Sequence, residues 1–192
     1  MNLFSLLAES FDLPILDWIA ENLWCPFLDA LMPVVTVLGD AGIFWIALAV
    51  VLLFFKKTRR VGLGMGIALL MGLVICNLAL KPLCQRPRPY DYQYDIFSKV
   101  IPLLIERQHD FSFPSGHTIA SFEAAGVIWL NNKKWGAGAL ALASLIAFSR
   151  LYLYVHYPTD VLSSIVLGLG LAVLGNWLAR RVPDRYLLRK SA

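Results

Sequence analysis

The segment Ser149–Asp160, SRLYLYVHYPTD, joins two long apolar runs and contains three side chains that hydrocarbon does not tolerate without a reason. Arg150 can bind an oxyanion, and His156 can attack an electrophile or transfer a proton. Asp160 follows four residues later, in the expected first turn of the next helix, from where its carboxylate can orient the imidazole. We therefore expect one helix to end and another to begin here, with a reactive site at the water-facing end of a membrane bundle.

The composition is that of an integral membrane protein. Of the 192 residues, 58% are hydrophobic and only 16% are charged, whereas a soluble domain of this length carries more polar surface. We predict an all-α, polytopic membrane helical bundle that forms one domain, residues 1–192. The net charge of +4 does not indicate nucleic-acid binding, because the basic residues fall in short clusters between apolar runs, where they set membrane topology.

Six apolar runs predict about six transmembrane helices. The runs are Leu23–Leu38, Ala41–Phe55, Val61–Leu80, Pro114–Leu130, Trp135–Val155 and Pro158–Ala179. The first contains two prolines and an aspartate, so the sequence does not decide whether it crosses the bilayer fully. Met1–Glu21 alternates apolar and acidic residues, which predicts an amphipathic segment on the membrane surface with a break near Pro14.

The basic residues predict the orientation. With these spans, eleven of the 17 lysines and arginines lie on one side, which the positive-inside rule makes cytoplasmic. These eleven are Lys56, Lys57, Arg59, Arg60, Lys133, Lys134, Arg180, Arg181, Arg185, Arg189 and Lys190. Six spans then place both termini in the cytoplasm and the polar loop Lys81–Phe113 outside, and we expect the membrane to be a bacterial cell membrane.

Three short motifs lie at the outer ends of the predicted spans. They are Lys81 and Arg88 within KPLCQRPRP, the tetrapeptide Pro114-Ser115-Gly116-His117, and the trio Arg150, His156 and Asp160 of the opening segment. Because all three motifs face the same side of the membrane, they can meet in one water-accessible pocket.

The side chains of this pocket suit a phosphoryl group. Lys81, Arg88 and Arg150 supply positive charge for its non-bridging oxygens. Ser115 and Gly116 open a helix whose unpaired N–H groups and positive dipole end attract anions. With two histidines present, one can act as the nucleophile and the other as the general acid.

The motif set KxxxxxxRP, PSGH and SRxxxxxHxxxD resembles the type 2 phosphatidic acid phosphatase superfamily, the integral-membrane lipid phosphate phosphatases, whose site is similar to those of glucose-6-phosphatase and the vanadium haloperoxidases. The resemblance covers Lys81–Asp160. It implies that His156 attacks phosphorus to form a phosphohistidine, that Asp160 orients it, and that His117 protonates the leaving alkoxide and then activates water. It also assigns phosphate binding to Lys81, Arg88, Ser115, Gly116 and Arg150.

The resemblance implies a reaction without a metal or another cofactor. The sequence agrees, because no cluster of spare carboxylates that Mg²⁺ would use surrounds the motifs. Cys25, Cys76 and Cys84 are scattered and lack the paired spacing of zinc sites.

The predicted function is hydrolysis of a lipid phosphomonoester or diphosphate at the extracytoplasmic face, with the bilayer and a membrane lipid phosphate as partners. Phosphatidylglycerophosphate, phosphatidate and undecaprenyl diphosphate are all open as substrates, phosphotransfer is an alternative to hydrolysis, and the oligomeric state is undetermined. A non-catalytic anion channel or transporter with a basic outer vestibule is the alternative from another class. A haloperoxidase that holds vanadate fits a chain this apolar poorly.

Five polar residues outside the motifs need a separate interpretation. We expect Arg86 and Lys99 to contact lipid headgroups, and Arg107 and His109 to be solvated loop residues. Glu123 lies six residues beyond His117 inside a predicted span. An intramembrane carboxyl group is a functional candidate, and the alternative is a neutral acid that is hydrogen-bonded to another helix.

Overall fold

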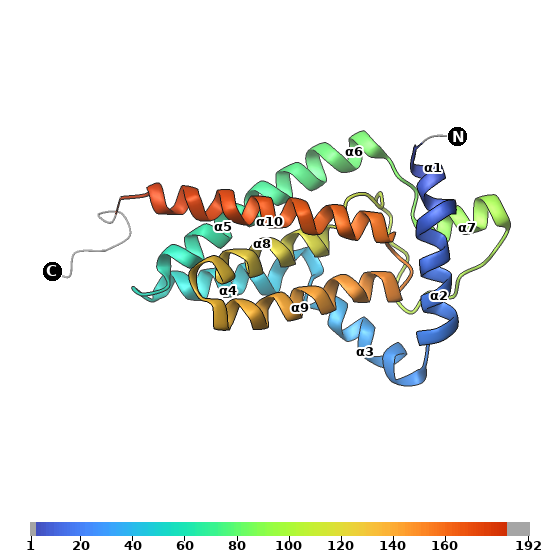
Figure 1. Ribbon diagram of the computed structural model, residues 1–192, viewed down its shortest axis with the longest axis horizontal. Coiled ribbons are helices and arrows are strands. Elements are labelled where there is room, and N and C mark those ends of the chain that lie inside the picture. The colour runs from blue at the N-terminus through green and yellow to red at the C-terminus, as the bar shows by residue number, and fades with distance from the viewer. Residues whose placement is uncertain (1–2, 184–192) are drawn as a thin grey trace.

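The computed structural model describes residues 3–183, and every regular element in that range is a helix. The helices are α1 (Leu3–Leu7), α2 (Leu13–Leu23), α3 (Pro26–Val37), α4 (Ile43–Phe54), α5 (Arg59–Leu73), α6 (Lys81–Cys84), α7 (Pro89–Phe97), α8 (Gly116–Asn131), α9 (Lys133–Tyr152) and α10 (Pro158–Arg181). Two π-helical segments, Ala8–Asp12 and Val74–Leu80, and the 3₁₀ turn Asp40–Gly42 connect consecutive helices. The long helices run side by side along one axis (Figure 1), and the all-α prediction is confirmed.

Helix α8 lies at the centre of the bundle, packed against α9, α10 and α5. Small residues let the backbones approach closely. A methyl group at Gly168 of α10 would lie 2.9 Å from the carbonyl oxygen of Ile119, and one at Gly175 would lie 2.8 Å from that of Gly64. Contacts of this kind hold helices together in lipid, where burial of apolar surface does not drive helices together.

The number of membrane crossings differs from the expected pattern. Among the described residues, three helical stretches are long and apolar enough to span a membrane, Arg59–Phe97, Lys133–Tyr152 and Pro158–Arg181. A fourth span arises if α3 and α4, which meet at an angle of 41°, form one bent crossing. Helix α8 has 16 residues, fewer than the roughly 20 that a full span needs, so the predicted count of six is not confirmed.

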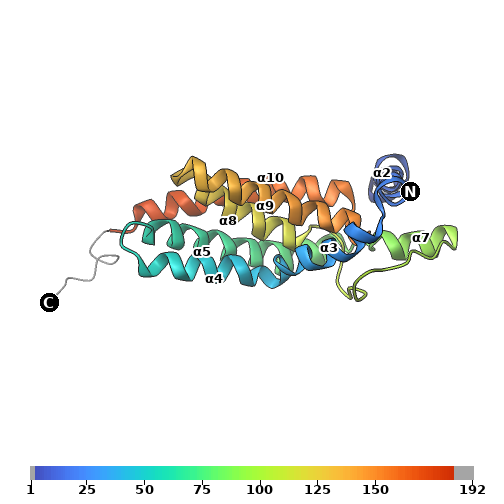
Figure 2. The ribbon, with the colours of Figure 1, turned by 90° about the horizontal axis from the view of Figure 1, so that it is seen from below.

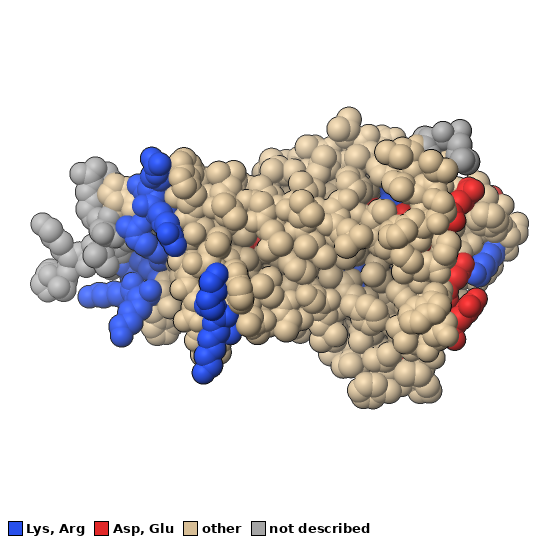
Figure 3. All heavy atoms as spheres, viewed as in Figure 1, with Lys and Arg blue, Asp and Glu red and all other residues tan. Residues whose placement is uncertain are grey.

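The two ends of the bundle carry different charges. Figure 3 shows most of the visible lysines and arginines gathered at the end where α10 finishes, and acidic side chains with a few basic ones at the opposite end. At the basic end, the Arg60 guanidinium donates to the carbonyl oxygens of Ala179 and Arg180, at 3.0 and 3.2 Å, which ties α5 to α10. Three members of the predicted basic group lie outside the described residues, namely Arg185, Arg189 and Lys190.

The N-terminal helices lie at the opposite end from these basic residues. Helices α1 and α2 run across the bundle axis beside α7 (Figure 2), and Tyr92 of α7 donates to Glu9 at 2.6 Å. The described residues begin and end at opposite ends of the bundle, so the expectation that both termini lie on the same side of the membrane is not confirmed. The reason is the connection at Ala41 and Gly42, whose positive φ values of 49° and 68° bend the path between α3 and α4 instead of reversing it.

The helical path near Pro14 is also continuous. Residues Leu7, Asp12 and Leu13 all have right-handed helical backbone angles, and a π-helical turn takes the place of the predicted break. Proline cannot donate to a carbonyl one turn earlier, and the wider hydrogen-bond spacing of the preceding π turn accommodates this missing donor.

The arrangement predicts that α2 and the start of α9 lie on opposite sides of the membrane. Single cysteines at Glu21 and Lys133, both exposed, should react with a membrane-impermeant maleimide from opposite faces of sealed vesicles. The background should carry serine at Cys25 and Cys84, which are partly accessible. Labelling of both positions from the same face would contradict this topology and support six crossings.

Candidate active site

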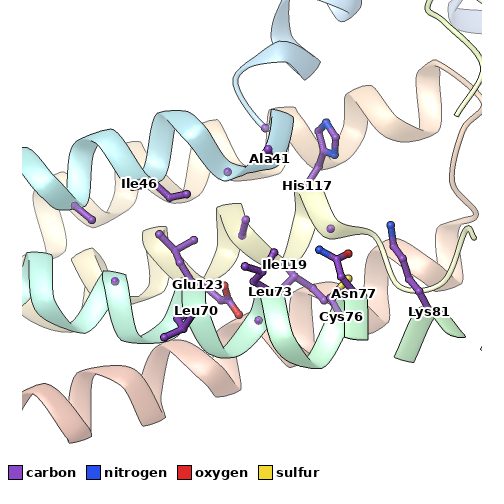
Figure 4. Close-up of a pocket in the computed structure, with 18 of the residues that line it drawn as sticks. Ala41, Ile46, Leu70, Leu73, Cys76, Asn77, Lys81, His117, Ile119 and Glu123 are labelled. Carbon is purple, nitrogen blue, oxygen red and sulfur yellow. The ribbon is translucent and has the colours of Figure 1, made fainter. Parts of the chain in front are cut away.

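The three sequence motifs converge on one cavity at the acidic end of the bundle. The cavity has a volume of about 470 Å³. Its polar end is lined by residues from five segments, Lys81, Arg88, His117, Arg150 and His156. Figure 4 shows Lys81 and His117 at this end, with the apolar residues Ile46 and Leu70 further along the bundle. Two histidines and three cations that are distant in sequence therefore face the same enclosed volume.

Each histidine lies beside an arginine. The Nη1 atom of Arg88 is 3.4 Å from Nε2 of His156, and Nη1 of Arg150 is 3.4 Å from Nε2 of His117. Both arginines are almost completely buried. Arg88 is fixed by donation to the Val155 carbonyl oxygen at 2.8 Å, and Arg150 by donation to the Thr36 hydroxyl at 2.5 Å. The guanidinium groups are thus held next to the imidazole atoms that would meet a phosphoryl group.

The surroundings of His156 favour its neutral, unprotonated form. Burial, followed by the positive charges of Arg88, Arg150 and Lys81, lowers the pKa of His156 well below the ordinary 6.5. The opposing effect of the Asp110 charge is weaker. A neutral imidazole carries the lone pair that a nucleophile needs.

Asp160 lies next to His156 but is engaged mainly with other groups. Its Oδ2 is 3.5 Å from Nδ1 of His156, longer than a good hydrogen bond. That Nδ1 has no hydrogen-bond partner among the described residues. The Asp160 carboxylate instead accepts from Arg86 at 2.5 Å, from the Ser112 hydroxyl at 2.5 Å and from the Tyr157 N–H at 3.0 Å. The structure therefore places Asp160 beside the imidazole, in a carboxylate network rather than a simple pair.

Only part of the predicted α8 anion site faces the cavity. Gly116 is among the lining residues, whereas Ser115 is fully buried outside it. The Ser115 N–H donates to the Ser164 hydroxyl at 2.8 Å, and its own hydroxyl pairs with that of Thr118 at 2.9 Å. Ser115 consequently shapes the start of α8, after the cis Phe113–Pro114 peptide, and its N–H is not free for a ligand.

Arg86 is the residue that sequence reasoning placed least correctly. The expectation of a lipid-headgroup contact is wrong, because the side chain is 1% exposed and lies between Asp12 at 2.7 Å and Asp160 at 2.5 Å. It also donates to the Thr159 hydroxyl at 2.8 Å and stacks 3.7 Å from the centre of the Tyr157 ring. The signal in the sequence was Asp12, since a carboxylate next to a membrane core needs a cationic partner. Lys99 forms an ion pair with Asp17 at 2.8 Å.

Two further carboxylates at the site were missed because neither belongs to a motif. Asp110 accepts hydrogen bonds from Lys81 and, at 2.5 Å, from Nη2 of Arg88. Although burial raises the pKa of Asp110, the Lys81 hydrogen bond and the Arg88 charge lower it far more. Asp40, in the bend between α3 and α4, lies 2.7 Å from Nε2 of His117. Both side chains are about half exposed, so they face the entrance from water.

The fold and this pocket define a class of protein, the helical membrane phosphatases. A family model described as the PAP2 superfamily matches residues 44–183. The chain belongs to this superfamily, and the predicted resemblance is confirmed; the related PAP2 phosphatases are phosphoric ester hydrolases.

Individual relatives extend the comparison. The chain is 30% identical to an undecaprenyl-diphosphatase of Sulfolobus acidocaldarius over 68% of its length, and the match spans 61% of that relative. The crystal structure of Aquifex aeolicus LpxE aligns with a TM-score of 0.74 at 28% identity, over 86% of this chain and 94% of the other. A PAP2-type phosphatidylglycerolphosphate phosphatase from Bacillus subtilis aligns with a TM-score of 0.68 at 27% identity, covering 95% and 94%. These neighbours support an integral membrane protein.

Potential metal ligands do not gather at this site. Within residues 3–183, no group of three or more histidine, cysteine, aspartate or glutamate side chains is arranged to hold a metal ion. The positively charged groups that line the cavity are side chains of lysine and arginine, Lys81, Arg88 and Arg150.

Removal of Asp12 should destabilise the whole protein. Asp12→Ala leaves the buried Arg86 without one of its two ion-pair partners and the Thr159 N–H without its acceptor, a change that costs about 3–5 kcal/mol. The matched control on the same segment is Glu9→Ala, which loses only an exposed bond to Tyr92. Equilibrium unfolding in detergent should show a large decrease in the free energy of unfolding for Asp12→Ala and a small decrease for Glu9→Ala. Equal losses would contradict the structural role of the ion pair.

His156 should be neutral at pH 6.5, because its lowered pKa means that the proton leaves at a more acidic pH. NMR titration of ring-labelled histidine, with the signal assigned by its disappearance in His156→Asn, measures this directly. Arg88→Gln removes one neighbouring positive charge and should move the titration of His156 to higher pH. A wild-type midpoint near 6.5 or above would show that the buried cations do not act on this ring.

Proposed function

We propose that this protein hydrolyses a lipid phosphomonoester or diphosphate at the extracytoplasmic face through a phosphohistidine intermediate, and that residues 1–192 act as a single domain. The observation that carries the proposal is the shared cavity, in which His156 and His117 face the same volume as three buried cations. The Nε2 atom of each ring is 3.4 Å from an arginine that can hold the phosphoryl oxygens.

In the first step, the lone pair on Nε2 of His156 attacks phosphorus and forms an N–P bond as the bond from phosphorus to the lipid oxygen breaks. Lys81, Arg88 and Arg150 bind the non-bridging oxygens, whose negative charge is stabilised in the transition state. The start of α8 at Gly116 adds a positive dipole end. His117 donates its proton to the leaving oxygen, so the lipid departs as an alcohol, or as a monophosphate when the substrate is a diphosphate.

In the second step, His117 accepts a proton from water, and the resulting hydroxide oxygen attacks the phosphohistidine. The N–P bond breaks, inorganic phosphate leaves, and both histidines return to their starting protonation states. Asp160 stabilises the positive charge that His156 carries as the phosphohistidine forms, from its position 3.5 Å away. No metal ion or cofactor takes part in this sequence.

The ion pairs of Asp110 also affect how the substrate phosphate binds. Its carboxylate occupies Lys81 and Arg88, two of the cations assigned to the substrate phosphate. A dianionic phosphoryl group has more charge and more acceptor oxygens than a carboxylate, so it displaces Asp110 on entry. The half-exposed position of Asp110 allows that movement without opening the helical bundle.

The intermediate is the sharpest test of the reaction. With a terminally ³²P-labelled lipid diphosphate, the quenched wild-type protein should carry acid-labile, base-stable radioactivity, and His156→Asn should carry none. His117→Asn should accumulate the label, because a diphosphate has a good leaving group but the second step needs the base. Phosphate release without any labelled protein would exclude the covalent mechanism. Anion binding or flux without phosphate release, unaffected by His156→Ala, would instead support a channel or transporter.

Asp40 should act as a positioning residue for His117. Its carboxylate lies 2.7 Å from Nε2 of His117, where its negative charge favours the protonated ring and opposes part of the effect of the nearby Arg150 charge. Asp40→Asn should therefore slow cleavage of alkyl phosphates by roughly 10- to 100-fold, with a much smaller effect on p-nitrophenyl phosphate, whose leaving group needs no proton. Equal losses with both substrates would indicate a general structural defect and contradict this role.

A further inference from the structure

Glu123 is a buried carboxyl group that the proposed reaction does not use. It lies on α8, two turns into the bundle from the histidine end, and is 1% exposed. Neither of its side-chain oxygens has a hydrogen-bond partner among the described residues, so the alternative of a carboxyl group bonded to another helix is not what the structure shows. Glu123 instead lines the cavity, between α8 and α5 near Leu70 and Leu73 (Figure 4).

The surrounding chain makes room for this carboxyl group. A methyl group at Gly72 of α5 would lie 2.6 Å from Oε2 of Glu123 and closer still to Oε1, so any larger residue there would displace the carboxyl group from its present position. A buried polar group without a partner is unfavourable, and an ionised one is more so. A bound molecule that supplies a hydrogen-bond partner would remove this penalty.

The depth of Glu123 indicates which part of a lipid it meets. It follows His117 by six residues, which is about 9 Å along a helix axis, and side chains tilt toward the N-terminus of their helix, here toward the phosphate site. In a phosphorylated glycerolipid or acylated sugar, the first acyl carbonyl lies about five bonds, or roughly 6 Å, from phosphorus. Glu123 is therefore at the level of acyl carbonyls when a phosphate occupies the polar end.

The remainder of the cavity has the length and the polarity of a lipid chain. It extends from Lys81 to Gly62 near the start of α5, roughly 25–30 Å of helix, and is lined by apolar side chains such as Ile46, Leu69 and Leu73. Either an acyl or a prenyl chain matches this length and polarity. Only the acyl lipid presents a carbonyl oxygen to Glu123, whereas a prenyl chain would leave the carboxyl group unpartnered.

Resting on the proposed function, we infer that Glu123 in its neutral form donates a hydrogen bond to an acyl carbonyl of the substrate. The substrate class is then an acylated lipid phosphate, with ester- or amide-linked chains, in preference to a polyprenyl diphosphate. Glu123 sets specificity through binding and takes no part in bond cleavage.

The test removes first the acyl carbonyl of the substrate and then the carboxyl group of Glu123. Purified wild type should hydrolyse diester phosphatidate with a kcat/KM roughly tenfold above that for the diether analogue of equal chain length, which lacks the carbonyls. Glu123→Met, of similar size without a donor, should bring the ratio near one, whereas Glu123→Gln keeps an N–H donor and most of the preference. Val166→Ala, at an exposed position on α10 outside the cavity, should keep the wild-type ratio.

Because each ratio compares two substrates on one protein sample, partial unfolding of a variant cancels. A wild-type ratio near one, or an unchanged ratio in Glu123→Met, would overturn the inference, and the wild-type ratio decides even if that variant is inactive. Faster hydrolysis of undecaprenyl diphosphate than of the diester by wild type would also overturn it. The proposed reaction is tested separately with His156→Ala. If this variant releases no phosphate, the reaction stands whatever the ratios are, and if it still releases phosphate, the reaction itself is refuted.

Discussion

The ion pairs of Arg86 are the interaction on which the rest of the site depends. The guanidinium joins Asp12 of the N-terminal segment to Asp160 of α10, and each partner is 74 residues away in sequence. Hydrogen bonds from Thr159 to Asp12 and from Ser112 to Asp160 add to the ion pairs and help to offset the cost of burying these charges. Since Asp160 also receives the Tyr157 N–H, the position of the preceding His156 follows from the same network. The N-terminal segment is thus part of the site's framework.

The carboxylates near the cavity fall into two groups with different consequences. Asp12 and Asp160 are fully buried, and their charges are bound permanently to Arg86. Asp40 and Asp110 are about half exposed. Asp40 contacts His117, and Asp110 contacts Lys81 and Arg88. On the proposed mechanism, Asp110 gives up its contacts with Lys81 and Arg88 to the substrate phosphate, while Asp40 stays beside His117. Burial therefore separates the carboxylates that hold the structure from those that lie at the histidine and the cations of the cavity.

Polarity changes along the cavity in the same order as along a lipid phosphate molecule. Positive charge lies at the end formed by Lys81, Arg88 and Arg150, one unpartnered carboxyl group lies deeper at Glu123, and apolar side chains follow toward Gly62. A headgroup, a linkage and a chain would meet these zones in turn. If the proposed reaction and the inferred role of Glu123 hold, reaction and selectivity reside in different parts of one cavity, so that substrate preference can change without a change in the chemistry.

Much of this protein could be predicted from its sequence. Long apolar runs must form helices in a membrane, because hydrocarbon satisfies no backbone polar group, and the spacing within the three motifs pointed to the family and to the residues around the cavity. Arg86, Asp40 and Asp110 could not be assigned in this way, since their partners lie in other segments and no local pattern records pairings across 22 to 77 residues. The number and direction of the crossings depended on the bend at Ala41 and Gly42. Local hydrophobicity and motif spacing thus determined the class and the reactive groups, while tertiary packing alone decided which buried charges meet and where the N-terminal segment lies.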